Sequence, residues 1–275
     1  MKKIKIIALI FLIFILFSFN CQATVISRFA GRNQNTDRKI VVLMYHRITE
    51  NINETGTYAI TPKVLEKDIL NLKNNGFVFS FANEVDKVIK ENPKSNVAVL
   101  TFDDGYESDY EYVLPLLEKH KAKATFFVFA SMLDKPYYMN KTQLIKLSKS
   151  NYACIGNHSF DIHNKTANEI KTLFSNKSNV YKIADDFNKN KNILEKIINK
   201  PVTVLSYPNG IYNCYTDDFL KKSNVCDVSL STEERTYFSY TANGVIGRYN
   251  RSDKRTVQDI IDIISKKIRR ISHSD

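Results

Sequence analysis

Two adjacent carboxylates, Asp103 and Asp104, end a short apolar run and are followed by Gly105. The run, residues 98–102, is rich in strand formers, and a helical pattern begins soon after the glycine. In parallel α/β folds, the loops at the carboxyl ends of strands carry the catalytic side chains. Neighbouring strand residues point to opposite sides, so only a turn at Gly105 lets both carboxylates face one site. The alternative is an ordinary Asp-Gly turn in a hairpin.

Five histidines are present, so each can be considered singly. His158 and His163 follow a second predicted strand, residues 153–156. On a helix, five positions would place them about 140° apart, so they converge only across a turn. Two histidines and a nearby carboxylate suit a catalytic zinc ion with an open position for water; the alternative is a polar loop with unrelated histidines. His120 ends a Lys-rich helix and His273 lies near the C-terminus, so we assign neither to a site.

Two more strand ends carry residues of functional types. His46 follows the apolar run 39–45, and the predicted strand 202–207 leads into the turn 208–210. Taken alone, the first is explained by a partly buried histidine and the second by an ordinary Pro-x-Gly turn. Four separate strand ends with such residues are improbable as independent coincidences. An active site at the carboxyl edge of a sheet is therefore the favoured interpretation.

Predicted strands alternate with predicted helices from residue 39 onward. The strands are 39–46, 77–81, 98–102, 124–130, 153–156, 202–207, 225–230 and 245–249. The helices are 62–75, 83–92, 110–120, 139–150, a long zone over 166–199, 216–223 and 257–271. This alternation predicts an α/β fold with a parallel sheet, wound into a barrel or left as an open doubly wound form. Residues 39–275 are enough for one domain with its own core.

The N-terminus has the pattern of an export signal. Residues 1–23 start with lysines and continue as an apolar run that is short for a membrane span. Cleavage after Ala23, lipid attachment at Cys21 and an uncleaved anchor remain open. Residues 24–38 are expected to be a tether. We expect an exported protein of the periplasm, cell envelope or extracellular space, associated with the membrane only through the N-terminal segment.

The chain is basic, with 40 Lys and Arg, 29 Asp and Glu, and a formal net charge of +11. This charge suits an anionic envelope polymer or a membrane face. The basic residues form no stripe and no nucleic-acid-binding motif, so no nucleic acid partner is expected. In an oxidising compartment Cys214 and Cys226 are able to pair. No Cys-x-x-Cys pair is present, which argues against a zinc site built from cysteines.

At these residues the sequence resembles the NodB-type polysaccharide deacetylases, over roughly residues 39–250. The family motif Thr-Phe-Asp-Asp-Gly is intact at residues 101–105. The His-Ser/Thr-x-x-His motif starts at His158, with its second histidine one place later, at His163. This spacing, with the strand that ends at His46, resembles the subgroup that deacetylates poly-β-1,6-N-acetylglucosamine. In that subgroup an N-terminal histidine replaces the late Leu-x-His motif of the wider family, which is absent here.

The resemblance implies a distorted (β/α) barrel with fewer than eight complete units. It implies a metal site of Asp104, His158 and His163, holding zinc or another divalent transition metal, and Asp103 as the general base. Protonated His46 would be the general acid, with a pKa raised by neighbouring carboxylates.

The third family motif appears as Ser-Tyr-Pro-Asn-Gly, without the Arg that much of the family has and with Asn in place of Tyr. The resemblance implies that the backbone N–H of Asn209 donates to the oxyanion, a role that survives this exchange because it uses the main chain. Tyr207 and Pro208 would shape the groove beside it.

The function so implied is metal-dependent hydrolysis of acetamide groups on N-acetylglucosamine units of an envelope or biofilm polysaccharide, with release of acetate. A peptidoglycan or chitooligosaccharide deacetylase would use the same site. A non-catalytic envelope protein that binds sugar is an alternative of another class. The presence of all four residues Asp103, Asp104, His158 and His163 favours an enzyme.

Overall fold

The structure is a computed structural model and describes residues 38–235 and 244–272. Within these ranges one sheet contains nine strands, all paired in parallel. They are β1 (Ile40–Tyr45), β4 (Phe77–Phe79), β5 (Asn96–Asp104), β6 (Ala124–Val128), β7 (Ala153–Asn157), β8 (Val204–Ser206), β9 (Val228–Leu230), β10 (Val245–Ile246) and β11 (Tyr249–Asn250). The predicted parallel sheet is confirmed, and the alternative of a hairpin at Gly105 is wrong.

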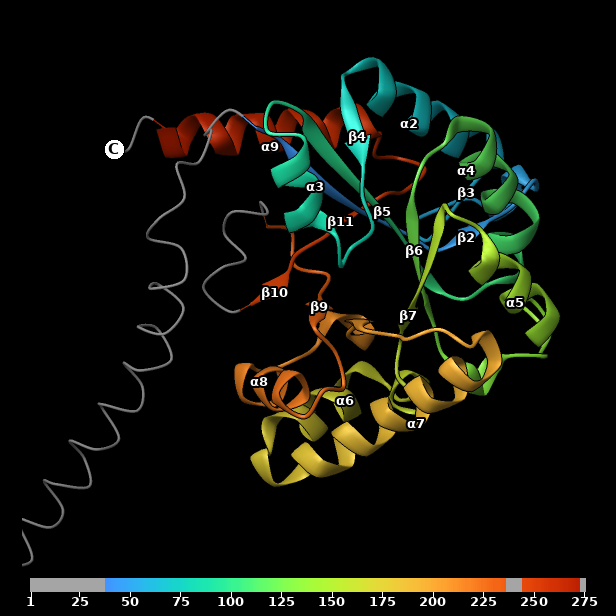
Figure 1. Ribbon diagram of the computed structural model, residues 1–275, viewed down its shortest axis with the longest axis vertical. Coiled ribbons are helices and arrows are strands. Elements are labelled where there is room, and N and C mark those ends of the chain that lie inside the picture. The colour runs from blue at the N-terminus through green and yellow to red at the C-terminus, as the bar shows by residue number, and fades with distance from the viewer. Residues whose placement is uncertain (1–37, 236–243, 273–275) are drawn as a thin grey trace, which may run out of the picture.

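The sheet curls into a distorted barrel (Figure 1). Its strand order is β10-β9-β8-β7-β6-β5-β1-β11, and β4 pairs with β5 outside this path. The two end strands are consecutive in the chain, because only Gly247 and Arg248 separate Ile246 of β10 from Tyr249 of β11. The two edges of the curled sheet therefore meet at Gly247 and Arg248. This settles the choice between barrel and open sheet in favour of the distorted barrel.

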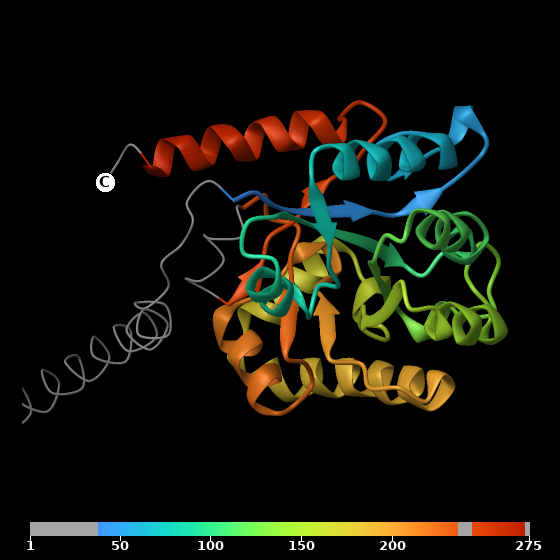
Figure 2. The ribbon, with the colours of Figure 1, turned by 45° about the horizontal axis from the view of Figure 1, so that its top comes forward.

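Helices pack against the sheet, most of them on its outer face and one, Val85–Glu91, against the residues of the barrel interior. They are α2 (Pro62–Asn74), α3 (Val85–Glu91), α4 (Leu114–His120), α5 (Lys141–Lys149), α6 (Ala167–Ser175), α7 (Val180–Ile198), α8 (Cys214–Lys222) and α9 (Val257–Ser272). Helices α2 and α9 pack against each other on the β1 side of the sheet, and α7 lies on the opposite side (Figure 2). Among the described residues, no helix is both long and apolar enough to cross a membrane.

Strand alternation separates two layers of core. In β1, Val41, Leu43 and Tyr45 pack outward against the helices, whereas Ile40 and Val42 point into the barrel. The barrel interior is filled by residues of these strands and their neighbours, including Ile40, Val42, Val97, Val99, Phe127, Val204, Leu230 and Ile246. Both faces of the strands are thus buried, as expected for a parallel sheet.

Several boundaries differ from the prediction for local reasons. The long helical zone divides into α6 and α7 because Asn176 caps a short 3₁₀ turn between them. The helix expected over 110–120 begins as a π-helical turn, Asp109–Val113, and becomes α-helical only at Leu114. Pro115 has no N–H to donate to a carbonyl four residues earlier, which favours this wider turn.

Two short strands, β2 (Arg47–Ile48) and β3 (Ala59–Ile60), form a small second sheet that the sequence did not predict. Cys214 is exposed at the start of α8 and Cys226 is buried, and no disulfide joins them in the structure. The expected signal and nearly all of the expected tether, residues 1–37, lie outside the described residues.

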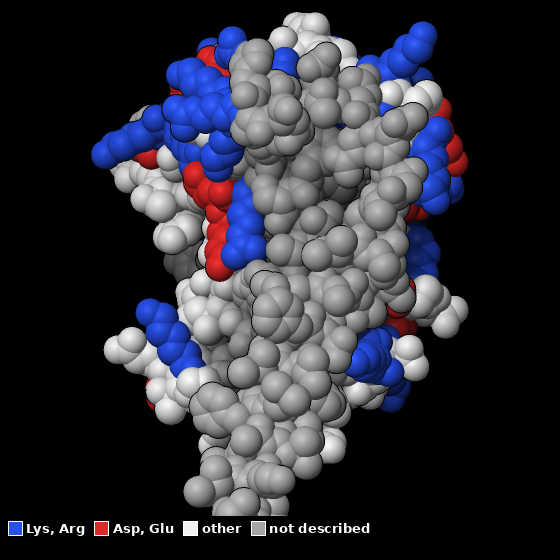
Figure 3. Space-filling view, turned by 90° about the vertical axis from the view of Figure 1, so that its left-hand side faces the viewer, with Lys and Arg blue, Asp and Glu red and all other residues white. Residues whose placement is uncertain are grey.

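The described basic residues are dispersed over the face seen in Figure 3. Lys and Arg stand there in separate groups, some of them beside Asp or Glu, and form no continuous stripe.

Candidate active site

Four strands direct polar side chains into one end of the barrel. His46 follows β1, Asp103 lies near the end of β5, His158 follows β7 and Ser206 ends β8. Each is an even number of positions from a residue of its own strand that packs in the barrel interior. Because side chains alternate across a strand, all four face inward. The carboxyl edge of the sheet therefore assembles residues from across more than half of the chain.

Asp104 turns toward the same site through an unusual backbone conformation. Its φ is +80°, and Gly105 follows with φ of +73°. A left-handed conformation is uncommon for a residue with a side chain and is often found at functional sites. The turn therefore starts at Asp104 itself, one residue before the predicted position. It brings two consecutive carboxylates to one site.

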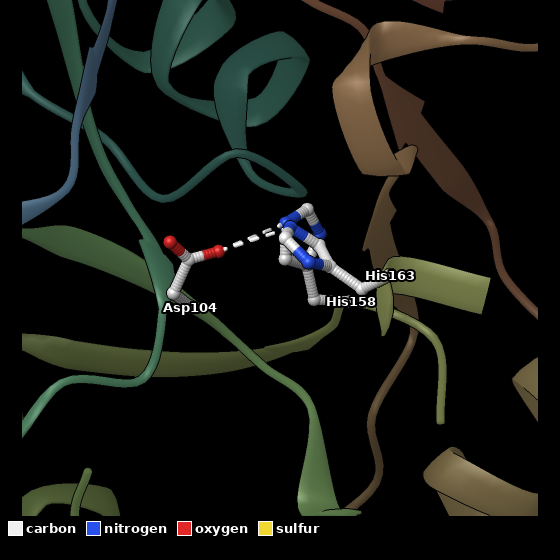
Figure 4. Close-up of side chains that lie close together, drawn as sticks. All are labelled: Asp104, His158 and His163. Atoms are coloured by element: carbon white, nitrogen blue, oxygen red, sulfur yellow. Dashed lines mark ion pairs between the residues drawn. The ribbon is translucent and has the colours of Figure 1, made fainter. Parts of the chain in front are cut away.

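Asp104, His158 and His163 form a cluster of potential metal ligands (Figure 4). Oδ1 of Asp104 lies 3.2 Å from Nε2 of His163 and 3.5 Å from Nε2 of His158. Two ligands about 2.1 Å from one zinc ion at a tetrahedral angle lie about 3.4 Å apart, so both separations fit. The Asp104 oxygen is buried and has no hydrogen-bond partner. A buried carboxylate oxygen in that state fits a position that a cation completes.

Other groups orient the two histidines. Nδ1 of His158 lies 2.9 Å from the carbonyl oxygen of Ser206. A carbonyl only accepts, so Nδ1 donates to it, which directs Nε2 toward Asp104; in the neutral imidazole the lone pair of Nε2 would be available to a metal. The ring of His163 stacks on Phe129 at 4.8 Å between centroids.

The loop that carries His163 is held by a carboxylate of α7. Asp186 accepts the backbone N–H groups of Phe160 and Asp161 at 2.8 and 2.9 Å. The N–H of His163 donates to Oγ of Ser159, whose own φ is +69°. The histidines thus converge across a turn, as the five-residue spacing predicts.

Contacts among these side chains fix their charge. Burial raises the pKa of Asp104, but its contacts with His158 and His163 outweigh burial and hold the pKa well below the usual range. Burial lowers the pKa of His163, whereas contact with Asp104 raises it, and the net direction is upward. Asp104 is therefore ionised and able to bind a cation.

Asp103 is held by a buried arginine. Arg248 donates from Nη1 to Oδ1 of Asp103 at 2.6 Å and from Nη2 to Oδ2 at 2.7 Å. Its remaining donors reach Thr101, Ser206 and the carbonyl oxygen of Ser231, so all five N–H groups are satisfied. Burial raises the pKa of Asp103, but the charge of Arg248 outweighs it, with help from His158, and the net pKa lies below the usual value. Asp103 is ionised and rigidly oriented.

His46 lies at the edge of the same cluster. Its Nδ1 is buried without a hydrogen-bond partner, and its ring meets the edge of Tyr58 at 4.7 Å. Burial lowers the pKa of His46, and the opposing charges of Asp103 and Asp104 do not make up for it. The expectation of a raised pKa is therefore wrong, because loss of water outweighs the two carboxylates.

The turn after β8 divides the three residues predicted there. Tyr207 is fully buried on the outer side of the sheet, and its hydroxyl donates to Asp217 at 2.8 Å. Pro208 is buried as well, whereas Asn209 is exposed with φ of +53°. Gly210 has no room for a side chain, because an added Cβ would lie 2.1 Å from Oγ1 of Thr232. Tyr207 therefore supports the turn from behind, and only Asn209 is presented at the surface.

One further carboxyl group lies close to the site. Asp109, in the π-helical turn, is fully buried, and neither of its side-chain oxygens has a hydrogen-bond partner. Burial raises its pKa well above the usual value, with a smaller effect from the charges of Asp104 and Asp103.

Sequence reasoning missed Arg248 and Ser206. Both point into the barrel, and Arg248 holds Asp103 while Ser206 contributes an acceptor to His158 and a hydroxyl to Arg248. The signal for Ser206 was its even spacing from buried Val204. Arg248 gave a weaker signal, a charged residue directly after Gly247 at the end of a late apolar run.

Comparison with known proteins agrees with this fold and site. Residues 90–227 match the family model of the polysaccharide deacetylases. The chain therefore belongs to the polysaccharide deacetylase family, and membership makes it a hydrolase of the deacetylase class.

Particular relatives extend beyond that match. The chain is 26% identical over 218 residues to the poly-beta-1,6-N-acetyl-D-glucosamine N-deacetylase of Staphylococcus aureus strain N315, covering 72% of this chain and 74% of that protein. It is 23% identical over 178 residues to YxkH of Bacillus subtilis strain 168, a protein named for the polysaccharide deacetylases. That match covers 64% of this chain and only 58% of the Bacillus protein.

Solved structures share the fold. IcaB from Ammonifex degensii superimposes with a TM-score of 0.70 at 20% identity, over 83% of this chain and 97% of that one. A de-N-acetylase from Aggregatibacter actinomycetemcomitans gives 0.69 at 18% identity, over 81% and 98%. The resemblance to the NodB-type deacetylases and the distorted barrel that it implies are confirmed.

Proposed function

We propose that this protein is a metal-dependent hydrolase that removes acetyl groups from N-acetylglucosamine units of an extracellular or envelope polysaccharide and releases acetate. The observation that carries the proposal is the cluster of Asp104, His158 and His163 beside an ionised Asp103 at the carboxyl edge of a parallel sheet. Amide hydrolysis needs an activated water, an oxyanion site and a proton for the amine, and the roles proposed below supply a group for each of these needs.

Asp104, His158 and His163 would hold the metal, and we propose zinc. Three ligands of this kind match a catalytic zinc site with an open position. A bound zinc ion would lower the pKa of a water molecule and polarise the acetyl carbonyl. Another divalent transition metal suits the same donors.

Asp103 is the proposed general base. Arg248 uses one lone pair on each carboxylate oxygen, and a second lone pair on each remains to accept the proton of the attacking water. The arginine keeps Asp103 ionised and oriented toward the site. The ion pair with Arg248 makes Asp103 a weaker base but fixes the position of its carboxylate.

His46 and Asn209 are proposed for the two remaining roles. Protonated His46 would donate to the departing amine nitrogen. The backbone N–H of Asn209 would donate to the oxyanion from its exposed turn. Because burial lowers the pKa of His46, the protonated form is in the minority at neutral pH.

The substrate class comes from the relatives. The Staphylococcus aureus relative is named for poly-beta-1,6-N-acetyl-D-glucosamine, and a β-1,6-linked N-acetylglucosamine polymer is our proposed substrate. Such a polymer lies outside the cytoplasm in the cell envelope or a biofilm, which agrees with the export signal expected in residues 1–23. We propose that the protein is exported.

The test is acetate release from a panel of acetylated oligomers. The panel contains β-1,6-linked N-acetylglucosamine oligomers, chitooligosaccharides and peptidoglycan fragments, each with zinc-loaded, chelator-treated and zinc-restored protein. We expect release from the β-1,6-linked oligomers, loss with chelator and recovery with zinc. Asp103→Asn should keep its zinc and lose about a hundred- to ten-thousandfold in turnover. Preferred release from another member of the panel would change the substrate, and no release from any would favour a sugar-binding protein.

A further inference from the structure

Two exposed tyrosines lie next to the residues of the site. The side chain of Tyr58 is 60% exposed, although its ring contacts the His46 ring at 4.7 Å. Tyr137 is 69% exposed. Large aromatic side chains normally bury most of their surface, so an exposed ring beside a catalytic residue needs a reason.

Arg47 joins the two tyrosines into one surface. Its backbone N–H donates to the carbonyl oxygen of Tyr58 at 3.1 Å. Its guanidinium lies over the ring of Tyr137, 5.5 Å from the centroid, and also pairs with Glu54 at 2.5 Å. Tyr58 and Tyr137 come from different loops and are both set against the residue that follows His46.

The loop that carries Tyr137 is fixed to the turn of the catalytic carboxylates. The N–H of Glu107 donates to the carbonyl oxygen of Tyr137 at 2.9 Å, and the N–H of Met139 donates to that of Gly105 at 3.1 Å. Gly105 directly follows Asp104. The position of Tyr137 relative to the metal ligands is therefore set by main-chain hydrogen bonds.

The backbone of Tyr137 is held in a costly conformation. Its φ is +72°, in the left-handed region that favours glycine. A bulky residue there is an outlier, and such strain is typical of functional sites. Packing does not explain the choice of tyrosine, because most of the side chain is in solvent. A binding role for the ring would explain it.

We propose that Tyr137 and Tyr58 form an aromatic platform that stacks on the pyranose rings of sugar units next to the unit being deacetylated. This inference rests on the proposed function. One face of a pyranose ring presents C–H groups and packs on an aromatic ring, while a tyrosine hydroxyl and Arg47 are able to bind the sugar hydroxyls. The platform would give the enzyme a preference for a chain over a single sugar.

Direct binding tests the platform without catalysis. In a zinc-loaded Asp103→Asn background, calorimetry should show affinity that increases from N-acetylglucosamine to its β-1,6-linked pentamer. Tyr137→Ala should weaken pentamer binding about tenfold, roughly the energy of one aromatic stacking contact. Binding of the monomer should not change. Tyr58→Ala should have a similar effect in this assay, which does not depend on His46.

The matched control is Tyr181→Ala. Tyr181 is also 69% exposed but lies on α7 and packs against Phe219 of α8. Its removal should leave pentamer binding unchanged. Equal affinity of Tyr137→Ala and its parent for the pentamer, or an equal loss in Tyr181→Ala, would overturn the platform.

Stability gives a second readout that separates binding from structure. Tyr137→Gly removes the ring and also relieves the left-handed strain, so its Tm should equal or exceed that of the parent. In the otherwise unaltered enzyme, the same variant should raise KM for the pentamer about tenfold with kcat nearly unchanged. A fall in Tm with unchanged KM would mean that Tyr137 is structural.

The two proposals fail in different ways. If the parent releases no acetate but Tyr137→Ala weakens oligomer binding, the platform stands and the proposed reaction fails. If acetate is released and Tyr137→Ala has normal KM at every chain length, the reaction stands and the platform fails. A parent that binds no oligomer overturns the platform as well.

Discussion

The two carboxylates of the site are neighbours in sequence, yet their surroundings are opposite. Both oxygens of Asp103 accept from Arg248, and every donor of that arginine has a partner within the chain. Oδ1 of Asp104 is equally buried but has no hydrogen-bond partner. The side of Asp103, the proposed base (the base side), is therefore complete in the protein alone. The side of the proposed metal ligands (the metal side) has a buried carboxylate oxygen that a cation would complete. The orientation of Asp103 does not depend on a bound cation.

The same contrast extends to the energy of each side. An ionised group buried without a partner is costly, so the protein neutralises Asp103 with a bidentate ion pair. On the other side, Oδ1 of Asp104 lies 3.5 Å from Nε2 of His158 and 3.2 Å from Nε2 of His163, and it has no hydrogen-bond partner. A cation that binds on this side would offset the cost of burying the Asp104 carboxylate, and its binding would therefore stabilise the folded protein.

The largest expected effect is loss of the metal side. His163→Ala removes one of three ligands, so bound zinc should fall to background and acetate release should become undetectable. Metal analysis of the purified variant measures the first and an acetate assay the second. His120→Ala is the matched control, because His120 contacts Glu66 outside the site. Full zinc occupancy in His163→Ala would mean that the ligand set is wrong.

Breaking the base side should mainly cost stability. Arg248→Met leaves the Asp103 charge buried without its partner, which should lower the free energy of unfolding by about 3–5 kcal/mol. Urea unfolding of the metal-free protein measures it. Adding Asp103→Asn removes the orphaned charge and should recover part of the loss, so the double-mutant cycle isolates the pair. Equal stability of Arg248→Met and its parent would contradict the contrast drawn above.

His46 links the two sides, and its loss should affect only turnover. His46→Ala should retain zinc, while amide turnover falls about a hundredfold. An aryl acetate ester, whose leaving group needs little protonation, should lose much less. Because the protonated form is required and burial lowers the pKa, amide turnover of the parent should fall as pH rises through a value below about 6.5. If amide turnover of His46→Ala falls with rising pH in the same way as that of the parent, another group supplies the proton.

The smallest expected effect concerns Asp109. Its folded-state pKa is raised, so between the unfolded pKa of about 3.9 and the folded value the native protein holds a proton that the unfolded chain releases. Stability therefore declines as pH rises through this window. Asp109→Asn should remove the decline and stabilise the protein at neutral pH by on the order of 1 kcal/mol. Parallel stability-against-pH curves for variant and parent would show that Asp109 is not buried as a neutral acid.

Local sequence patterns predicted much of the fold and part of the site. Apolar runs marked the strands, and Thr61, Pro62 and Gly76 marked the ends of α2 as observed. The structure brings together Asp104, His158 and His163, the three predicted metal ligands. The predicted place of Tyr207 in the groove is wrong for its side chain, because its odd spacing from Val204 places it on the outer face of the sheet. Applying the alternation of β8 would have exchanged Tyr207 for Ser206 among the site residues.

The remaining features depend on contacts between distant parts of the chain. Nothing near Arg248 in the sequence indicates that it reaches Asp103, because that contact exists only once the sheet has curled. The lowered pKa of His46 likewise depends on how many atoms surround it, which spacing does not reveal. The split of β10 and β11 was missed because the chain passes between two sheet edges within one short apolar run.

The contact between Arg248 and Asp103 also joins a late part of the chain to an early one. The two residues are 145 positions apart, and all three proposed metal ligands precede residue 164. During synthesis from the N-terminus, the metal ligands emerge long before the arginine that orients the base. Pairing of β11 with β1 joins the last strand of the sheet to its first and brings Arg248 into place. A chain that lacks its last segment would therefore carry the proposed metal ligands without the arginine that orients Asp103, the proposed base.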